Sequence, residues 1–219
     1  MTSCHCQVVD KQFDTRVARR DLLRFLRRGP EPSTRHMLAA IVALPLPPGP
    51  TLLDVGGGIG ALHHTLLDRG FARAVQVDLS RAYLATAAEE ATRRGHSGRV
   101  VFQHGDLSSL APGLPRADVV TLDRVVCCDP DFTRLLSAAA ERARCAVTFS
   151  YPRPRWLVRV FVATANGARR LMGQAFRAYV HSPAAMTAVL EQSGFRRAWT
   201  GGSWAWAVDL FERREAIPA

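Results

Sequence analysis

The stretch LLDVGGGIGALHH, which runs from Leu52 to His64, joins an apolar run to a helix-like run through four glycines. Glycine loses more conformational freedom on folding than any other residue, so a concentration at Gly56, Gly57, Gly58 and Gly60 is costly. A glycine-rich turn after a first strand lets a ligand approach the backbone, and the N-terminus of the next helix attracts negative charge. The stretch therefore predicts a strand, a ligand-binding turn and a helix.

The same alternation of strand and helix continues along the chain. Continuous apolar strands such as ADVVTLD are typical of a parallel sheet that is covered on both faces. Two strand-like runs near the end meet across Gly201 and Gly202, which predicts an antiparallel hairpin. The pattern predicts strands at 51–55, 73–78, 100–104, 117–122 and 145–150, and helices at 59–69, 81–94, 131–143, 155–173 and 183–193.

The first 50 residues have a different, helical pattern. Apolar residues recur at helical spacing over 8–28, and a second helix is expected to begin near Ser33 as its N-cap. The run PLPPGP at 45–50 reads as a rigid connector. We therefore expect residues 1–50 to form a helical lid with its connector, and residues 51–219 to form an α/β, Rossmann-like domain. Its sheet should have seven mostly parallel strands and end in the antiparallel hairpin.

Composition limits the classes of protein that fit. Of 219 residues, 47 % are hydrophobic and 22 % charged, which is typical of a globular chain. Because the N-terminus has no apolar signal core and the five cysteines are odd in number, we expect a cytoplasmic protein with reduced thiols. The formal net charge of +10, nearly all from arginine, fits either an anionic partner or GC-rich codon usage.

Four aspartates stand at the carboxyl ends of the first four predicted strands: Asp54, Asp78, Asp106 and Asp123. The carboxyl ends of parallel strands share one edge of the sheet, where open α/β folds bind their ligands. Each aspartate alone could cap a helix. Together they predict a single site at this edge.

This combination resembles the class I S-adenosylmethionine-dependent methyltransferases, over residues 51 to about 212. The resemblance implies S-adenosylmethionine as cofactor, with its methionine part over the turn from Gly56 to Gly60 and its amino group near Asp54. It implies that Asp78 holds the ribose, that Asp106 and Leu107 flank the adenine, and that Leu79 and Asp123 also belong to the cofactor site. The glycines also fit the dinucleotide pattern of dehydrogenases, but the HGDL stretch and the closing hairpin favour the methyltransferases.

The acceptor is harder to predict. The segment DRVVCCDPDF after the fourth strand departs from the N/D-P-P-Y/F box of nucleobase methyltransferases, which disfavours nucleic acid. We expect a small molecule methylated on oxygen, nitrogen or carbon, as in specialised metabolism. The stretches RRDLLRFLRRGPEPSTRHML and LDRVVCCDPD resemble a bacterial branch grouped with magnesium-protoporphyrin O-methyltransferases. Candidate substrate-binding residues are Phe13, Arg16, Arg20, Arg124, Cys127, Cys128, Tyr151 and Arg153, and candidate acid–base residues are Asp123, Tyr151 and His181.

The cysteines leave a second hypothesis open. If the N-terminal helices fold over the site, Cys4 and Cys6 could meet Cys127 and Cys128 and bind zinc, copper(I), a metal-chelated substrate or a metalloid. The alternative is that Cys127 and Cys128 are small buried residues and the other two belong to a loose terminus. Further hypotheses are an RNA or protein methyltransferase and a non-catalytic cofactor-binding scaffold.

The predicted helix over 155–173 is basic and amphipathic. Trp156, Leu157, Val160 and Phe161 would share an apolar face, with arginines around it. This pattern is typical of a core-facing helix, and also of a helix that lies on a membrane surface or covers an apolar ligand.

Overall fold

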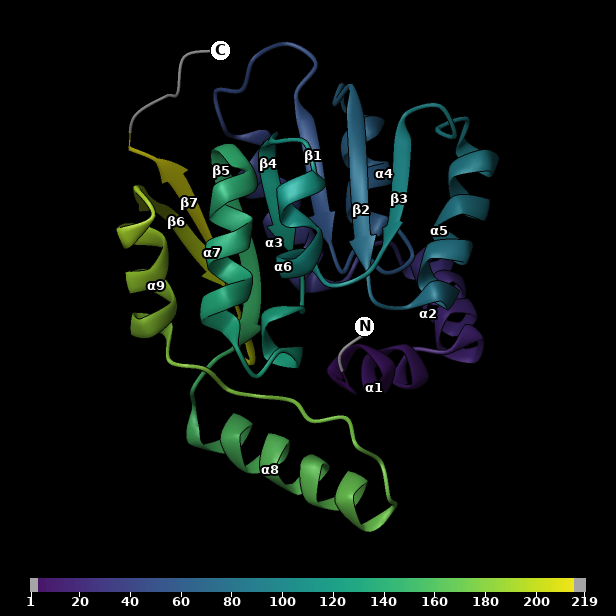
Figure 1. Ribbon diagram of the computed structural model, residues 1–219, viewed down its shortest axis with the longest axis vertical. Helices are drawn as coiled ribbons and strands as arrows, with labels where there is room; N and C mark the ends of the chain where they lie inside the picture. Colours follow the sequence, from purple (N-terminus) through teal and green to yellow (C-terminus); the bar gives the residue numbers. More distant parts are fainter. Residues whose placement is uncertain (1–3, 215–219) are drawn as a thin grey trace.

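One mixed sheet of seven strands forms the centre of the computed structural model, which describes residues 4–214 and their side chains from Cys6 onward (Figure 1). The strand order is β3-β2-β1-β4-β5-β7-β6. β1 to β5 are parallel, and β7 runs antiparallel between β5 and β6. The predicted Rossmann-like α/β fold with its closing hairpin is confirmed. The strands are β1 (Thr51–Val55), β2 (Arg73–Asp78), β3 (Val100–His104), β4 (Ala117–Leu122), β5 (Ala143–Pro152), β6 (Phe195–Gly202) and β7 (Trp206–Arg213).

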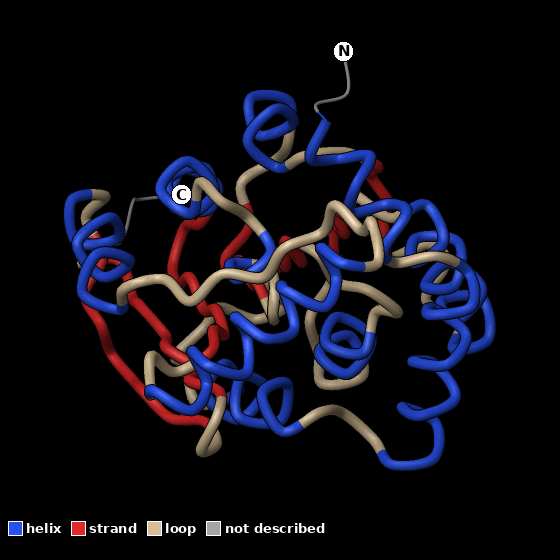
Figure 2. Tube along the Cα trace, turned by 90° about the horizontal axis from the view of Figure 1, so that it is seen from below, coloured by secondary structure: helices blue, strands red, loops and turns tan. Residues whose placement is uncertain are grey.

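Helices cover both faces of the sheet, as Figure 2 shows from below. One face carries α3 (Pro32–Val42), α4 (Ala61–Leu67) and α5 (Arg81–Arg94), and the other carries α6 (Leu107–Leu110), α7 (Phe132–Arg142) and α9 (Pro183–Gln192). Short 3₁₀ turns occur at Ala111–Gly113 and Val126–Cys128. Three further helices lie at the carboxyl ends of the parallel strands: α1 (Cys4–Gln12), α2 (Thr15–Arg28) and α8 (Trp156–Leu171).

The two faces of the sheet have separate hydrophobic cores. On the α7 side, Phe149 and Phe211 are fully buried and stack with their ring centroids 5.8 Å apart. On the other side, Met37 and Ile41 of α3 pack with Leu66 and with strand residues of the central sheet. Of the helices in the first 50 residues, α3 is thus part of the core, and α1 and α2 remain to cover the carboxyl edge of the sheet. No helix within residues 4–214 is long and apolar enough to cross a membrane.

The prediction of one helix over 8–28 is wrong. The chain breaks at Phe13–Asp14, because the Asp14 carboxylate accepts a hydrogen bond from the Val17 backbone N–H (2.9 Å) and starts a new helix. The predicted N-cap at Ser33 is also wrong. Helix α3 begins one residue earlier at Pro32, whose fixed φ suits the first turn, and Ser33 is buried inside the helix.

Element bounds otherwise follow the apolar pattern closely. The strands predicted at 51–55, 73–78, 100–104 and 117–122 and the helix at 81–94 have those bounds, whereas β5 extends to 143–152. The predicted turn across Gly201 and Gly202 is wrong, because both glycines pair with β7 as the last residues of β6. The reversal lies at 203–205, closed by a hydrogen bond from the Ser203 N–H to the Trp206 carbonyl (2.8 Å).

Candidate functional site

A cavity of about 510 Å³ opens at the carboxyl edge of β1 to β4 and is covered by α1 and α2. The loops after all four strands reach it, as parallel strands require. The structure brings together nearly all of the residues predicted to bind the cofactor. Those that line the cavity are Asp54, Gly56, Gly57, Gly58, Asp78, Leu79, Asp106, Leu107 and Asp123.

The glycine turn is shaped by close neighbours within the chain. Gly56 has a φ of 59°, and a Cβ on it would collide with the Val125 side chain from the loop after β4. Gly60 does not line the cavity. It caps α4 with a φ of 81°, and a Cβ there would lie 2.6 Å from the His63 ring. Side chains are therefore excluded by the protein's own packing at these positions, whatever ligand also approaches.

The carboxylate of Asp54 is fixed from two sides beneath this turn. Its Oδ1 accepts a hydrogen bond from Thr121 Oγ1 on β4 (2.8 Å), and its Oδ2 accepts one from His63 Nδ1 on α4 (2.9 Å). Asp54 and His63 are both fully buried. These two hydrogen bonds therefore link β1 to β4 and to α4 at the wall of the cavity.

Asp78 presents its carboxylate at the end of β2. Oδ2 accepts a hydrogen bond from the Gly58 N–H (3.0 Å), and Oδ1 accepts one from the Ser80 N–H (2.8 Å). Burial raises the pKa of Asp78 from its usual 3.8 to about 6, and the nearby charge of Asp54 acts in the same direction. The two backbone donors oppose this rise only in part, so the group titrates close to neutral pH.

Asp106 marks the far end of the cavity at the start of α6. Its Oδ2 accepts hydrogen bonds from Ser109 Oγ (3.1 Å) and from Arg134 Nη2 (3.0 Å). These partners hold the carboxylate at the helix N-terminus, beside Leu107, which is buried against the core. The order along the cavity wall is thus the glycine turn, then Asp78, then Asp106.

Helices α1 and α2, which cover the cavity, are joined to α5 by hydrogen bonds. The Phe13 carbonyl accepts a hydrogen bond from Ser80 Oγ (2.6 Å), and the Tyr83 hydroxyl donates to Asp21 Oδ2 (2.6 Å). The ring of Phe13 lies 5.6 Å from that of Tyr83 and 5.7 Å from that of Phe176, measured between centroids. These aromatic contacts form an apolar roof over the cavity.

Next to the glycine turn, the cavity continues into a space lined by cationic and thiol side chains. Asp123 stands between this space and β4, where it accepts hydrogen bonds from Thr34 Oγ1 of α3 and from Ser150 Oγ of β5 (2.6 Å). Arg124 follows with a left-handed φ of 61°. The other lining groups here include Arg20, Arg24, Cys127, Cys128, Arg169 and Phe176.

Four of the predicted substrate or catalytic residues lie outside the cavity lining. Tyr151 is buried in the α7-side core and donates its hydroxyl to Asp209 Oδ2 (2.9 Å). The guanidinium of Arg153 donates to the carbonyls of Gly201 and Ser203 in the terminal hairpin. His181 Nε2 lies 2.9 Å from the Asp129 carbonyl, and Arg16 lies in a separate groove along α2. Tyr151 and Arg153, which the sequence offers as substrate-binding candidates, thus lie outside the lining of this cavity.

The cysteines do not form a cluster of metal ligands among the described side chains. Cys127 and Cys128 have their sulfurs 3.8 Å apart, and both thiols lie 3.5 Å from the Arg124 carbonyl. The hydrogen bond with Cys128, together with burial, raises the pKa of Cys127 and keeps it a thiol. From Cys6 to Arg214, no three His, Cys, Asp or Glu side chains converge as a metal would need. The side chain of Cys4 lies outside the described part.

Several cavity residues carried no clear signal in the sequence. Thr34, Tyr83 and Phe176 come from three different elements and reach the site only through the tertiary fold. Arg24 belongs to the same row as the predicted Arg20, at i and i+4 on α2, and that helical spacing was the one available clue.

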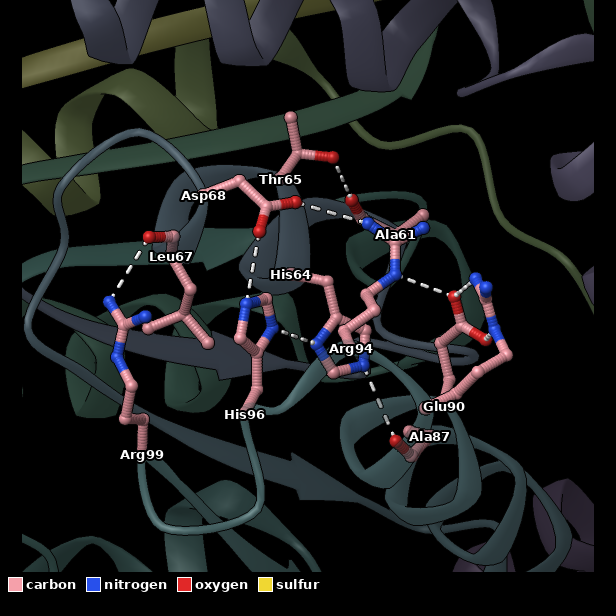
Figure 3. Close-up of polar contacts among 11 residues, drawn as sticks. Ala61, His64, Thr65, Leu67, Asp68, Ala87, Glu90, Arg94, His96 and Arg99 are labelled. Carbon is pink, nitrogen blue, oxygen red and sulfur yellow. Dashed lines mark hydrogen bonds and ion pairs between the residues drawn. The ribbon is translucent and has the colours of Figure 1, made fainter.

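Behind the cavity wall lies a cluster of buried histidines that joins α4, α5 and the loop before β3 (Figure 3). His64 Nδ1 lies 3.2 Å from His96 Nδ1, and His64 Nε2 lies 3.3 Å from the Ala87 carbonyl. His96 Nε2 in turn lies 3.0 Å from Asp68 Oδ1 at the surface. Burial, aided by the neighbouring His63, lowers the pKa of His64 to about 3. His64 is therefore neutral in the folded protein.

The strand order, the glycine turn and the row of strand-end aspartates are those of the class I S-adenosylmethionine-dependent methyltransferase fold. Residues 52–145 match the family model described as "Methyltransferase domain", which places the turn, Asp78, Asp106 and Asp123 within that match.

The individual comparisons extend over different parts of the chain. A release factor glutamine methyltransferase from Cereibacter sphaeroides is 36 % identical over 92 residues, which are 42 % of this chain and 31 % of that protein. The match thus spans less than a third of that relative.

Solved structures are similar over a longer part. Magnesium protoporphyrin IX methyltransferase from Synechocystis PCC 6803 with bound S-adenosylmethionine superposes with a TM-score of 0.72 at 20 % identity, over 97 % of this chain and 98 % of that one. An O-methyltransferase family 2 protein from Planctomyces limnophilus in complex with apigenin has a TM-score of 0.60 at 20 % identity, over 83 % and 61 % of the two chains.

The histidine cluster predicts how stability depends on pH. Below its ordinary pKa of 6.5, His64 takes up a proton in the unfolded chain but not in the folded protein until about pH 3. The free energy of unfolding should therefore fall as the pH drops through this window. In urea titrations at several pH values, His64→Gln should show a shallower fall than the wild type, and His36→Gln should match the wild type. Parallel curves for all three proteins would contradict this role of His64.

Proposed function

We propose that the protein transfers the methyl group of S-adenosylmethionine to a small-molecule acceptor. The observation that carries the proposal is the division of one cavity into two parts. One part has the glycine turn, Asp78 and Asp106, and the other is an arginine-lined space beside Asp123. The two parts meet under the roof of α1 and α2, so a donor and an acceptor can lie side by side.

The residues along the first part fit the chemistry of the cofactor. Asp78 lines the cavity, and each of its carboxylate oxygens can accept a further hydrogen bond beside the one from a backbone N–H, which suits the two ribose hydroxyls. Asp106 can accept from the adenine amino group, with Leu107 against the ring. Asp54, anchored by His63 and Thr121, supplies negative charge for the amino group of the methionine part.

The cofactor, when bound, supplies a methyl group on a positively charged sulfur that leaves as a neutral thioether. The protein's main contribution is then to hold the acceptor in line with that methyl group, which can lower the barrier by roughly 7–11 kcal/mol. The roof formed by Phe13, Tyr83 and Phe176 excludes water. Asp123 is the candidate proton acceptor for an acceptor hydroxyl or amine. Its two hydroxyl partners fix its orientation.

The lining of the second part favours an acceptor that is apolar and carries a carboxylate. Arg20, Arg124 and Arg169 offer donors for a carboxylate, and Phe13 and Phe176 offer aromatic surface. This composition fits a planar organic acid. The magnesium protoporphyrin and apigenin named with the two similar structures are planar molecules as well, which supports this acceptor class.

A second candidate function rests on the arginines of α2. They line a groove that shares Arg20 and Arg24 with the cavity. A continuous cationic path into the site is what an acceptor attached to RNA or to an acidic protein would require. The groove is lined by Thr15, Arg16, Arg19, Arg20, Leu23, Arg24, Arg27 and Arg28.

The direct test is calorimetric binding of the product S-adenosylhomocysteine. We expect Asp78→Asn to weaken binding by about 10- to 100-fold, because a charged hydrogen-bond acceptor is lost. Glu212→Gln, which removes a surface carboxylate that pairs with Arg196 on the hairpin, should bind as the wild type does. Equal affinity for all three proteins, or no binding at all, would contradict the proposal.

The affinity should also depend on pH in a defined direction. Because the pKa of Asp78 is raised to about 6, the free protein carries a protonated Asp78 below that value. Binding of S-adenosylhomocysteine should strengthen as the pH rises through 6 and then level off, and Asp78→Asn should lack this step. A step of the same size in Asp78→Asn would assign it to another group.

The left-handed backbone of Arg124 gives a prediction that separates stability from function. A non-glycine residue at a φ of 61° is strained. The free energy of unfolding of Arg124→Gly should therefore be about 1 kcal/mol higher than that of Arg124→Ala. Both variants should bind S-adenosylhomocysteine yet lose methyl transfer to a carboxylate-bearing acceptor. Denaturant titrations and single-turnover assays measure the two effects, and equal stability of the glycine and alanine variants would argue against strain.

The dependence of methyl transfer on ionic strength distinguishes the two acceptor classes. Methyl transfer from labelled S-adenosylmethionine is measured with a small-molecule extract and with total RNA, each over a range of ionic strengths. Transfer to RNA that falls steeply with salt and is lost in Arg19→Gln/Arg27→Gln would support the second candidate. The small-molecule proposal expects transfer from the extract to be little changed in that variant.

A further inference from the structure

Helix α8 stands apart from the body of the protein, below the carboxyl edge of the sheet (Figure 1). Val158 is its one buried residue. Its inner face is held by the segment 172–182, which runs back toward α9. Asn166 accepts a hydrogen bond from the Ala178 N–H (3.0 Å) and donates one to the Ala178 carbonyl (2.8 Å). The same segment is fastened to the body by the Tyr179 N–H, which donates to the Cys127 carbonyl (2.7 Å).

The outer face of α8 is apolar and open to solvent. Trp156 is 71 % exposed, Phe161 70 % and Leu171 91 %. Together with Leu157, Val160 and Thr164, they lie opposite the inner face, since Val158, Val162, Ala165 and Asn166 repeat at helical spacing toward the segment 172–182. The alternative of a core-facing helix is thus wrong, because the large apolar residues point away from the protein.

Arginines border this apolar face, and the surrounding stretch of sequence has no carboxylate to balance them. Arg155, Arg159 and Arg170 are exposed along one side of it, between the apolar and the inner faces. At the start of the helix, the guanidinium of Arg155 lies 5.5 Å from the ring centroid of the exposed Trp204. The sequence has no Asp or Glu from residue 142 to residue 190, a stretch that contains eight arginines.

We propose that α8 docks this protein on the surface of an anionic lipid bilayer. An apolar helix face bordered by cations is suited to lie at the boundary between headgroups and acyl chains, and tryptophan favours that boundary. Lipid phosphates supply the negative charge that this part of the chain lacks. A second copy of the chain would instead bring another carboxylate-free stretch against the first, so charge complementarity favours lipid over self-association.

Docking by the outer face of α8 would also bring the cavity, which lies on the inner side of this helix, close to the bilayer. Arg169 of α8 and both Phe176 and Ala178 of the following segment line the cavity. A lipophilic acceptor could then enter from the membrane, a consequence that rests on the proposed methyl transfer. The docking itself does not rest on it, because vesicle binding needs neither cofactor nor acceptor.

The test is co-sedimentation of the full chain with vesicles of phosphatidylcholine and phosphatidylglycerol in a 7:3 ratio, a composition chosen to resemble an anionic leaflet. We expect binding that weakens with salt, and no binding to pure phosphatidylcholine. Phe161→Ser/Leu171→Ser should reduce the partition coefficient at least about tenfold, through lost apolar burial. Arg159→Gln/Arg170→Gln should reduce it about 30-fold.

Matched controls keep the test independent of folding. Val42→Ser/Val101→Ser removes two apolar side chains that are each about half exposed, at 53 %, on other elements. Arg69→Gln/Arg73→Gln removes two exposed arginines near the start of β2, at the opposite edge of the sheet. Both controls should bind vesicles as the wild type does, and all variants should bind S-adenosylhomocysteine.

Three outcomes would overturn the proposal. The first is equal binding to anionic and neutral vesicles, or to neither. The second is wild-type binding by both α8 variants. The third is dimerisation in analytical ultracentrifugation that is lost in Phe161→Ser/Leu171→Ser while no variant binds vesicles, which would assign the face to a second copy. A loss of vesicle binding with S-adenosylhomocysteine binding intact refutes the docking alone, whereas the reverse refutes only the proposed function.

Discussion

The buried carboxylate of Asp54 is the constraint on which the rest of the site depends. It is held by His63 from α4 and by Thr121 from β4, and it lies so close to Gly57 that a Cβ there would come within 2.5 Å of its Oδ2. A buried carboxylate is stable only when its oxygens are well bonded. The hydrogen bonds of Asp54 therefore fix the glycine turn, the start of α4 and the end of β1 as one unit, against which Asp78 bonds Gly58.

Much of the fold could be predicted because its signals are local. Four parallel strands have the bounds that their apolar runs indicate, and the aspartates at their carboxyl ends share one cavity. The N-terminal break at Asp14 was missed because apolar spacing continues across it, and only the cap geometry shows where one helix stops. The two hairpin glycines do not by themselves locate the turn, because glycine occurs both in turns and at strand ends; only their pairing with β7 shows that they belong to β6.

The acceptor side of the site could be predicted much less well. Tyr151 and His181 are close in sequence to a strand end and to a helix start, which suggests a place at the site, yet Tyr151 is hydrogen-bonded to Asp209 in the core and His181 to backbone carbonyls. Conversely, Thr34 reaches Asp123 from 89 residues away in the chain. Contacts of this range depend on how α3 packs on the sheet, which no local pattern describes. The glycines of the turn are required by packing within the protein itself, in addition to any ligand that approaches them.

Seen as a whole, the carboxyl edge of the sheet combines three layers with different chemistry. The strand ends offer carboxylates, the cover over the cavity offers aromatic rings from Phe13, Tyr83 and Phe176 together with arginines of α2, and α8 offers an apolar face bordered by arginine. A cofactor, an acceptor and a membrane surface would each meet the layer that suits them. The central claim is that the first layer holds an S-adenosyl nucleoside. A crystal structure of the protein grown with S-adenosylhomocysteine tests it most directly. We predict density in the cavity with the ribose hydroxyls on the carboxylate of Asp78 and the adenine between Asp106 and Leu107. A cavity that stays empty at saturating ligand, or density for the nucleoside elsewhere on the protein, would contradict the account.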